Sequence, residues 1–149
     1  IERQIKRMED SVESDPDSAI GAAKELVESV CKTILFEIGD DKHEKYDFNE
    51  LVKATRETLN LLPAGIDNQK KGADAFKKVL QAASTMLDGM GEIRNLDGTG
   101  HGKISRTRGL EARHARLVVG IAGTLGRFLF DCFERQTNKA SLPDSAKKI

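Results

Sequence analysis

One segment of the chain combines a cation, an amide and a histidine at a spacing that suits phosphodiester chemistry. It spans Arg94 to Gly102, with Asn95 directly after the arginine and His101 between two glycines. Histidine titrates near neutral pH and exchanges a proton with a ribose 2′-hydroxyl or a leaving 5′-oxygen. Arginine stays charged and binds a phosphate that gains negative charge. We therefore predict that Arg94, Asn95 and His101 form a catalytic unit for metal-independent cleavage of RNA.

Two other ligands are conceivable for the same segment, and both fit its spacing poorly. The run from Gly98 to Lys103 has the glycines of a nucleotide-binding loop, but it lacks the G-x-x-x-x-G-K-[ST] spacing and lies between expected helices. A calcium loop counted from Asn95 places Gly100 correctly at the sixth position. At its twelfth position, however, it offers Arg106 where a bidentate glutamate is required.

Simpler structural roles compete with the catalytic interpretation. Arg94 and Asn95 suit the C-terminus of a helix, where a cation meets the dipole and asparagine is a common terminator. For His101, the simpler interpretation is that of a solvent-exposed loop residue without a catalytic role. We expect His114, on the inner face of the last helix, to make a core hydrogen bond more readily than to catalyse, and His43 to be exposed in a charged connector. Three histidines without clustered cysteines or carboxylates predict no metal site and no cofactor.

Charge is distributed unevenly although the net charge is zero. The segment 9–28 holds many acids and a single base, Lys24, whereas the segment 92–116 is basic and surrounds the Arg94–His101 unit. Basic clusters attract phosphates, although many are only solvated faces. Instead of contacting phosphates, any of these bases could pair with Glu92 or Glu111. The candidate RNA-binding residues are Thr99, Lys103, Arg106, Arg108, Arg113 and His114.

The elements that must position these residues are helices. Apolar residues recur at helical spacing in five segments, aromatic residues and prolines are few, and no strand or internal repeat is evident. We expect a short entry helix within 1–14 and further helices at about 15–38, 47–62, 68–96 and 109–135. Short connections then predict an all-α fold, an antiparallel bundle of four to five helices.

Local signals support these boundaries and assign the inward faces. Asp15 and Pro16 form a strong helix start, and Gly39 a stop. Gly120, Gly123 and Gly126 are unusual in a helix interior, and close helix–helix approach would explain them. Inward faces are expected for Phe76, Val79, Leu80, Ala83, Met86, Leu87, Met90 and Ile93, and for Leu110, His114, Leu117, Val118, Ile121, Leu125, Phe128, Leu129 and Cys132.

Three blocks of sequence in this order resemble a known family. They are residues 15–28, the segment from Arg94 to Gly102, and residues 112–118. Arginine, a polar residue and a histidine seven positions after the arginine resemble the R-x(4–6)-H signature of the HEPN superfamily of small helical nucleases. The wider pattern resembles the abortive-infection C-terminal domain family. Carried over by position, Arg94 and His101 are the catalytic pair and Asn95 is the polar residue after the arginine.

The resemblance implies a HEPN-like bundle at residues 15–137, an entry helix or linker at 1–14 and a polar tail at 138–149. It also implies a homodimer in which two motifs face one composite active site. RNA is the implied substrate, cleaved without metal to a 2′,3′-cyclic phosphate and a 5′-hydroxyl during phage defence or by a toxin. On the same basis, Glu25 is a candidate to orient Arg94 through an ion pair.

Partners and location follow more loosely. Because the chain starts at Ile1, we expect a processed product or a fragment, with an antitoxin or an upstream sensor domain as a possible partner. No apolar run is long enough to span a membrane and no signal peptide is visible, so a cytoplasmic protein with no membrane partner is expected. Cys31 and Cys132 are expected to be buried reduced thiols. Two alternatives are a non-catalytic RNA- or nucleotide-binding module, and a scaffold whose last-helix glycines mark a dimer face.

Overall fold

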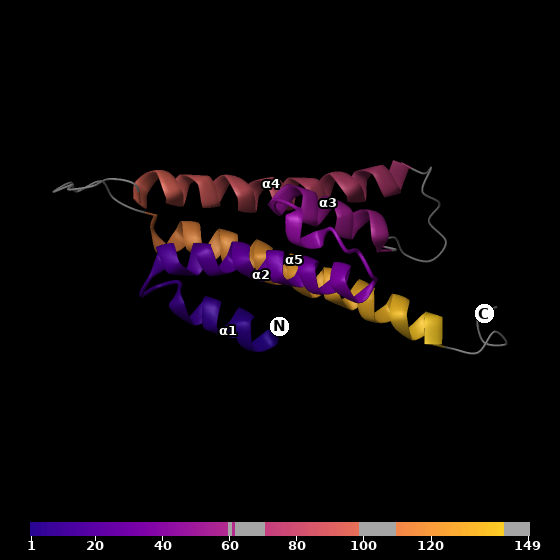
Figure 1. Ribbon diagram of the computed structural model, residues 1–149. Coiled ribbons are helices and arrows are strands. Elements are labelled where there is room, and N and C mark those ends of the chain that lie inside the picture. Colours follow the sequence, from indigo (N-terminus) through magenta and orange to yellow (C-terminus); the bar gives the residue numbers. More distant parts are fainter. Residues whose placement is uncertain (60, 62–70, 99–109, 142–149) are drawn as a thin grey trace.

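The chain folds into packed helices. The computed structural model describes residues 1–59, 61, 71–98 and 110–141, and these ranges contain helices and short connections without a strand (Figure 1). The elements in chain order are α1 (Glu2–Ser11), α2 (Pro16–Glu37), the 3₁₀ turn η1 (His43–Lys45), α3 (Phe48–Thr58), α4 (Lys71–Gly98) and α5 (Ala112–Ser141). The expected all-α class is confirmed.

Side-chain caps set the first residues of two helices. Asp15 accepts a hydrogen bond from the backbone N–H of Ser18 at 3.1 Å, and Pro16 occupies the first position of α2. Asp47 and Glu50 form a capping box at the start of α3, each side chain accepting a hydrogen bond from the other residue's N–H. Such caps satisfy backbone donors that have no partner within the helix.

Three helix ends differ from those expected. Helix α3 stops at Thr58 rather than near residue 62, because Leu59 turns extended (ψ 141°) and buries its side chain. Helix α4 continues through Gly98, and α5 continues to Ser141, six residues beyond Arg135. The expected start of α4 near Asn68 lies outside the described residues.

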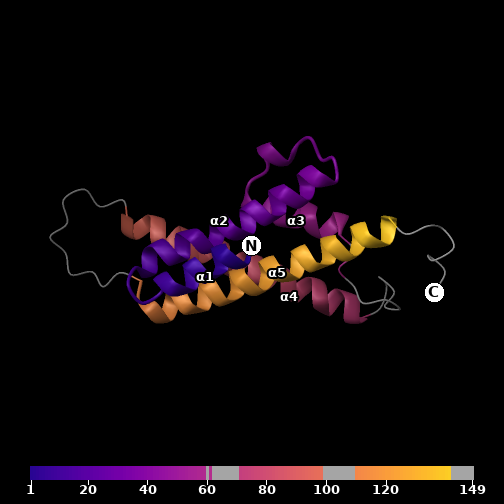
Figure 2. The same cartoon turned by 90° about the horizontal axis from the view of Figure 1, so that it is seen from below.

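Helices α2 and α5 form the centre of the bundle and run in the same direction, while α1 and α4 run back along them (Figure 1). Seen from below, α4 crosses obliquely, with its C-terminal half near α2 and its N-terminal half beyond α5 (Figure 2). As a result, α1 and α4 end at the same end of the bundle at which α2 and α5 begin. We call this the loop end.

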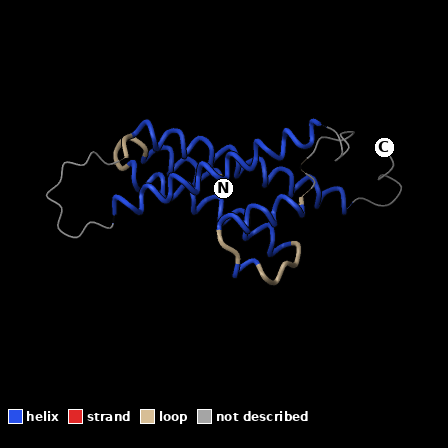
Figure 3. Tube along the Cα trace, turned by 90° about the horizontal axis from the view of Figure 1, so that it is seen from above, coloured by secondary structure: helices blue, strands red, loops and turns tan. Residues whose placement is uncertain are grey.

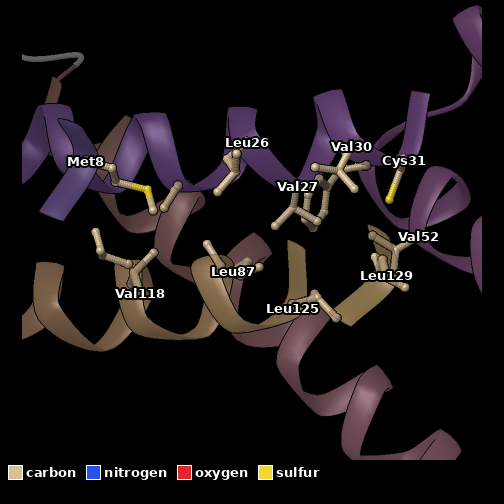
Figure 4. Close-up of a cluster of buried hydrophobic side chains, with 14 of the residues drawn as sticks. Met8, Leu26, Val27, Val30, Cys31, Val52, Leu87, Val118, Leu125 and Leu129 are labelled. Carbon is tan, nitrogen blue, oxygen red and sulfur yellow. The ribbon is translucent and has the colours of Figure 1, made fainter. Parts of the chain in front are cut away.

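The core lies between α2, α5 and the helices that cover them. Figure 4 shows Leu26, Val27 and Val30 of α2 facing Leu125 and Leu129 of α5. Val118 adds to the α5 side, Met8, Val52 and Leu87 extend the cluster to α1, α3 and α4, and all of these side chains are almost fully buried. Burial of apolar area of this kind is the main favourable term in folding.

Among the described side chains, the inward faces expected for α4 and α5 are wrong at three positions, and the side chains of Met90 and Ile93 lie outside that description. Val79 is 63% exposed, Met86 42% and Leu117 51%. Each is followed directly by a core residue, namely Leu80, Leu87 or Val118. Because neighbours on a helix are turned by about 100°, only one of each adjacent pair packs in the core.

The α5 glycines do not follow from close helix approach. A Cβ on Gly126 would lie 3.8 Å from Leu26 and Val30, and one on Gly123 would lie 3.4 Å from Ile5, which are ordinary contact distances. Gly120 has nothing within 4 Å of such an atom. Gly123 and Gly126 are therefore buried against α1 and α2 of the same chain, which argues against the glycine series as a dimer face.

The long connection between α2 and α3 contains a histidine whose expected exposure is wrong (Figure 3). His43 is buried, its Nδ1 lies 2.6 Å from the carbonyl oxygen of Asp40, and its ring meets Phe36 edge-on. Elsewhere, Cys31 is buried as expected, and burial raises the pKa of its thiol to about 11. Cys132 is only half-buried, and both thiols are free.

Candidate active site

The two motif residues that the structure includes lie inside a helix. Arg94 and Asn95 belong to the last two turns of α4, which continues to Gly98. Asn95 is therefore not the helix terminator that the simpler interpretation expects. The helix ends at the loop end of the bundle, the end at which α5 begins (Figure 1).

Most of the predicted site falls in the segment between α4 and α5. Thr99, His101, Lys103, Arg106 and Arg108 lie outside the described residues. Their placement relative to Arg94 stays a prediction.

His114 caps the helix on which it lies. Its Nδ1 accepts a hydrogen bond from the backbone N–H of Glu111 at 2.9 Å, and the ring is half-buried. Because Nδ1 is an acceptor here, the proton of the neutral ring lies on Nε2. This local role agrees with the expectation that His114 makes a structural hydrogen bond, and it leaves Nε2 as the atom that would meet a phosphate.

Two bases of α5 have acidic partners. The Nε of exposed Arg113 lies 3.1 Å from a carboxylate oxygen of Glu111, one of the pairings considered above. Arg116 pairs with Glu13, in the turn between α1 and α2. Both pairs are exposed, and exposed pairs are weak enough for a phosphate to compete for the cation. The acidic α1–α2 turn thus borders the basic start of α5.

A polar cluster at the edge of the core joins α2, α3 and α4, and its member on α4 precedes Arg94 by six residues. Lys24 Nζ lies 2.7 Å from Asp88 Oδ1, and Asn49 donates to Asp88 Oδ2 at 2.8 Å. The ammonium also lies 4.9 Å from the centre of the Phe48 ring. The hydrogen bond from Lys24 holds the pKa of the Asp88 carboxyl below its usual value. Both carboxylate oxygens are thereby tied to other helices.

Gly91 leaves room for the Lys24 side chain against α4. A Cβ on Gly91 would lie 3.1 Å from Lys24 Cδ, closer than side chains normally approach. On the same helix, Gly89 has nothing within 4 Å of an added Cβ. The lysine stem therefore crosses α4 in close contact with its backbone, one turn before Arg94.

The residue expected to orient Arg94 is Glu25, on α2. Glu25 lines a groove of about 510 Å³ between α1 and α2, together with Arg7, Met8 and Ser18. Its neighbour Lys24 faces α4 instead. The Arg94 side chain lies outside those that the structure describes, so the ion pair expected between Glu25 and Arg94 stays a prediction.

Sequence reasoning missed Lys24, Asp88 and Asn49 as a unit. Two signals were available: Lys24 is the one base in an acidic segment, and Asp88 interrupts an apolar stretch of α4 between Leu87 and Gly89. Neither signal shows that the two side chains meet, because they are 64 positions apart. The contact depends on how α4 crosses α2.

Comparison with protein families identifies the family of the chain. A family model described as Abi_C, HEPN-like domain, matches residues 1–133. The chain belongs to the Abi_C family of HEPN-like domains. The match includes α1 and ends within α5. No curated protein and no solved structure matches the chain.

Neither a membrane-spanning helix nor a metal-ligating cluster is found in the described ranges. No helix there is long and apolar enough to cross a membrane. No group of three or more His, Cys, Asp or Glu side chains in those ranges is placed to hold a metal ion.

Proposed function

We propose that this Abi_C domain is a metal-independent endoribonuclease with Arg94, Asn95 and His101 at its active site. Membership of a HEPN-like family supports the reaction class, since such domains often cleave RNA. The observation that carries the assignment to these residues is the course of α4. It holds Arg94 and Asn95 in its last two turns and ends at the loop end of the bundle, where α5 begins with Arg113 and Arg116 near its start.

The proposed reaction is a transesterification within the RNA backbone. His101 acts in general acid–base catalysis. As the base it takes the proton of the ribose 2′-hydroxyl, whose oxygen attacks the adjacent phosphorus. The bond from phosphorus to the 5′-oxygen breaks, and that oxygen leaves as a 5′-hydroxyl after receiving a proton. The other product carries a 2′,3′-cyclic phosphate.

Arg94 and Asn95 serve the same step in different ways. The guanidinium of Arg94 binds the non-bridging phosphate oxygens, which gain charge as the fifth bond to phosphorus forms. Asn95 orients either the phosphate or the histidine. In a homodimer with a composite site, the second copy supplies a second histidine, so that one ring acts as base and the other as acid.

RNA is expected to bind across the start of α5. Thr99, Lys103, Arg106 and Arg108 precede that helix, and Arg113 and His114 lie in its first turn. In the cell, the activity would serve abortive infection or a toxin in the cytoplasm, held in check by an antitoxin or a sensor domain.

The test is cleavage of total RNA by the purified chain in EDTA. Wild type is expected to cleave, leaving cyclic phosphate ends, and His101→Ala to lose about 10²–10⁴-fold in rate while keeping its helical circular dichroism. Arg94→Ala should lose activity comparably. Arg135→Ala is the matched control, an exposed arginine near the far end of α5. Full activity of His101→Ala, or loss of wild-type activity in EDTA, contradicts the mechanism.

The second candidate is a non-catalytic RNA-binding or dimerisation module. Its dimerisation alternative is favoured by the pairing of Arg113 and Arg116 with carboxylates, which leaves less free positive charge at the start of α5 to bind RNA. Gel-shift and light-scattering measurements separate the two. Binding of RNA by a dimer that never cleaves it supports the module.

A further inference from the structure

The polar cluster on α4 lies beside the proposed catalytic residues rather than among them. Asp88 precedes Arg94 by six residues and Gly91 precedes it by three, on one continuous helix. At about 1.5 Å per residue, Arg94 lies roughly 9 Å along the axis from Asp88. Whatever fixes α4 at Asp88 and Gly91 therefore fixes the position of Arg94 and Asn95.

We propose that Lys24, Asp88 and Gly91 are positioning residues for the RNA-cleavage site, holding the last two turns of α4 in place against α2. The inference rests on the proposed ribonuclease function. Lys24 supplies both contacts: its ammonium pairs with Asp88, and its stem crosses α4 at Gly91.

The geometry of the cluster restricts α4 in more than one direction. Lys24 on α2 binds one oxygen of Asp88, and Asn49 on α3 binds the other. Two hydrogen bonds from different helices oppose rotation of α4 about its own axis. The close approach at Gly91 sets how near α4 lies to α2 at this level.

A purely stabilising ion pair would behave differently. The side chains of Lys24 and Asp88 keep 30% and 24% of their surface exposed, and pairs near the surface contribute little to stability. By contrast, a shift of about 1 Å in a catalytic group costs on the order of 10²-fold in rate. Positioning therefore predicts a large effect on turnover with a small effect on the melting temperature.

The sharpest variant is Gly91→Ala, with Gly89→Ala as its matched control. Both replace a glycine in α4 by alanine and gain the same helix propensity. Only the first introduces a Cβ against Lys24. We expect Gly91→Ala to lower kcat at least about 10-fold without lowering the melting temperature, and Gly89→Ala to keep the wild-type kcat. Equal kcat values for the two variants overturn the inference.

The ion pair is tested by Lys24→Met, which keeps the stem, and Asp88→Asn, which keeps the shape. Their control is Glu2→Gln, which removes the negative charge and one of the two acceptors that Arg127 on α5 reaches at 2.9 Å from Glu2 on α1. We expect Lys24→Met and Asp88→Asn to lower kcat and to leave KM unchanged. Glu2→Gln should change neither kcat nor KM. A fall in activity that follows the melting temperature across all three variants overturns the inference.

Amide hydrogen exchange separates this inference from the ribonuclease proposal. In Lys24→Met, peptides covering 89–98 are expected to exchange at least several-fold faster, while those covering 71–80 keep the wild-type rate. This readout needs no cleavage. A wild-type protein that does not cleave RNA contradicts the ribonuclease proposal alone, whereas uniform or unchanged exchange along α4 contradicts the positioning role.

Discussion

Helix α2 makes two interfaces that differ in kind. Against α5 it packs Leu26, Val27 and Val30 into a dry apolar layer along much of its length. Against the C-terminal half of α4 it uses the Lys24 stem and the Lys24–Asp88 ion pair, and Asn49 of α3 adds an amide hydrogen bond to Asp88. Apolar packing is non-directional, whereas the ion pair and hydrogen bonds at Asp88 join particular atoms. The first interface thus builds the domain, and the second is the one that we propose to orient the helix that holds Arg94.

The largest expected effect comes from cutting into the apolar interface. Leu129→Ala removes a fully buried side chain on α5, and we expect a loss of about 2–5 kcal/mol in the free energy of unfolding. Leu117→Ala is the control on the same helix, where the side chain is half-exposed and the loss should stay within about 0.5 kcal/mol. Urea denaturation measures both. Similar losses would mean that the core does not lie between α2 and α5.

A smaller effect tests how tightly α2 and α5 approach. Gly126→Ala would place a methyl group at ordinary contact distance from Leu26 and Val30, so we expect a gain of up to about 1 kcal/mol from helix propensity. Gly120→Ala, in open space on the same helix, should gain about as much. Destabilisation by Gly126→Ala alone, in thermal unfolding, would show that the interface is closer than ordinary packing.

The smallest effect concerns the polar interface and depends on pH. The folded pKa of Asp88 is lowered by Lys24, so its stabilising contribution is present above the unfolded value near 3.9 and is lost as the pH falls through the folded value. We expect Asp88→Asn to cost below about 1 kcal/mol at pH 7, and progressively less as the pH falls below the unfolded value.

Melting curves from pH 2 to 7 measure this difference. Asp10→Asn, which breaks an exposed pair with Lys6, is the control and should cost at most about 0.5 kcal/mol throughout. A cost for Asp88→Asn that stays constant down to pH 2 would show that the Asp88 charge is not responsible.

Local chemistry made much of the fold predictable. Asp15 with Pro16 and Asp47 at the start of α3 act on neighbouring backbone groups, so their effect is contained in a few residues of sequence. Adjacent apolar pairs such as Leu87 and Met86 were not resolved, because helical spacing allows either to face inward and the neighbouring helices decide. His43 was missed for the same reason, since its partners come from the fold of the connection around it.

The sequence alone identifies the residues of the candidate site, but it does not determine how the neighbouring helices are arranged around them. The order of Arg94, Asn95 and His101 is a property of the sequence, and the family match agrees with the resemblance drawn from it. Which residue of α2 faces α4 depends on the crossing of two helices. The choice between Lys24 and Glu25 turns on about 100° of helix rotation, which no sequence pattern in α2 determines.

The oblique course of α4 makes it a lever. Phe76, near one end, rests edge-on against Phe128 of α5 with ring centres 5.4 Å apart, and Asp88 lies twelve residues further on. A straight helix pivoting at Asp88 moves its two arms in opposite directions, and a tilt of about 5° displaces the backbone of Arg94 by somewhat less than 1 Å. Such a tilt would couple the Phe76 end of α4 to the backbone of Arg94, the arginine that we propose for catalysis.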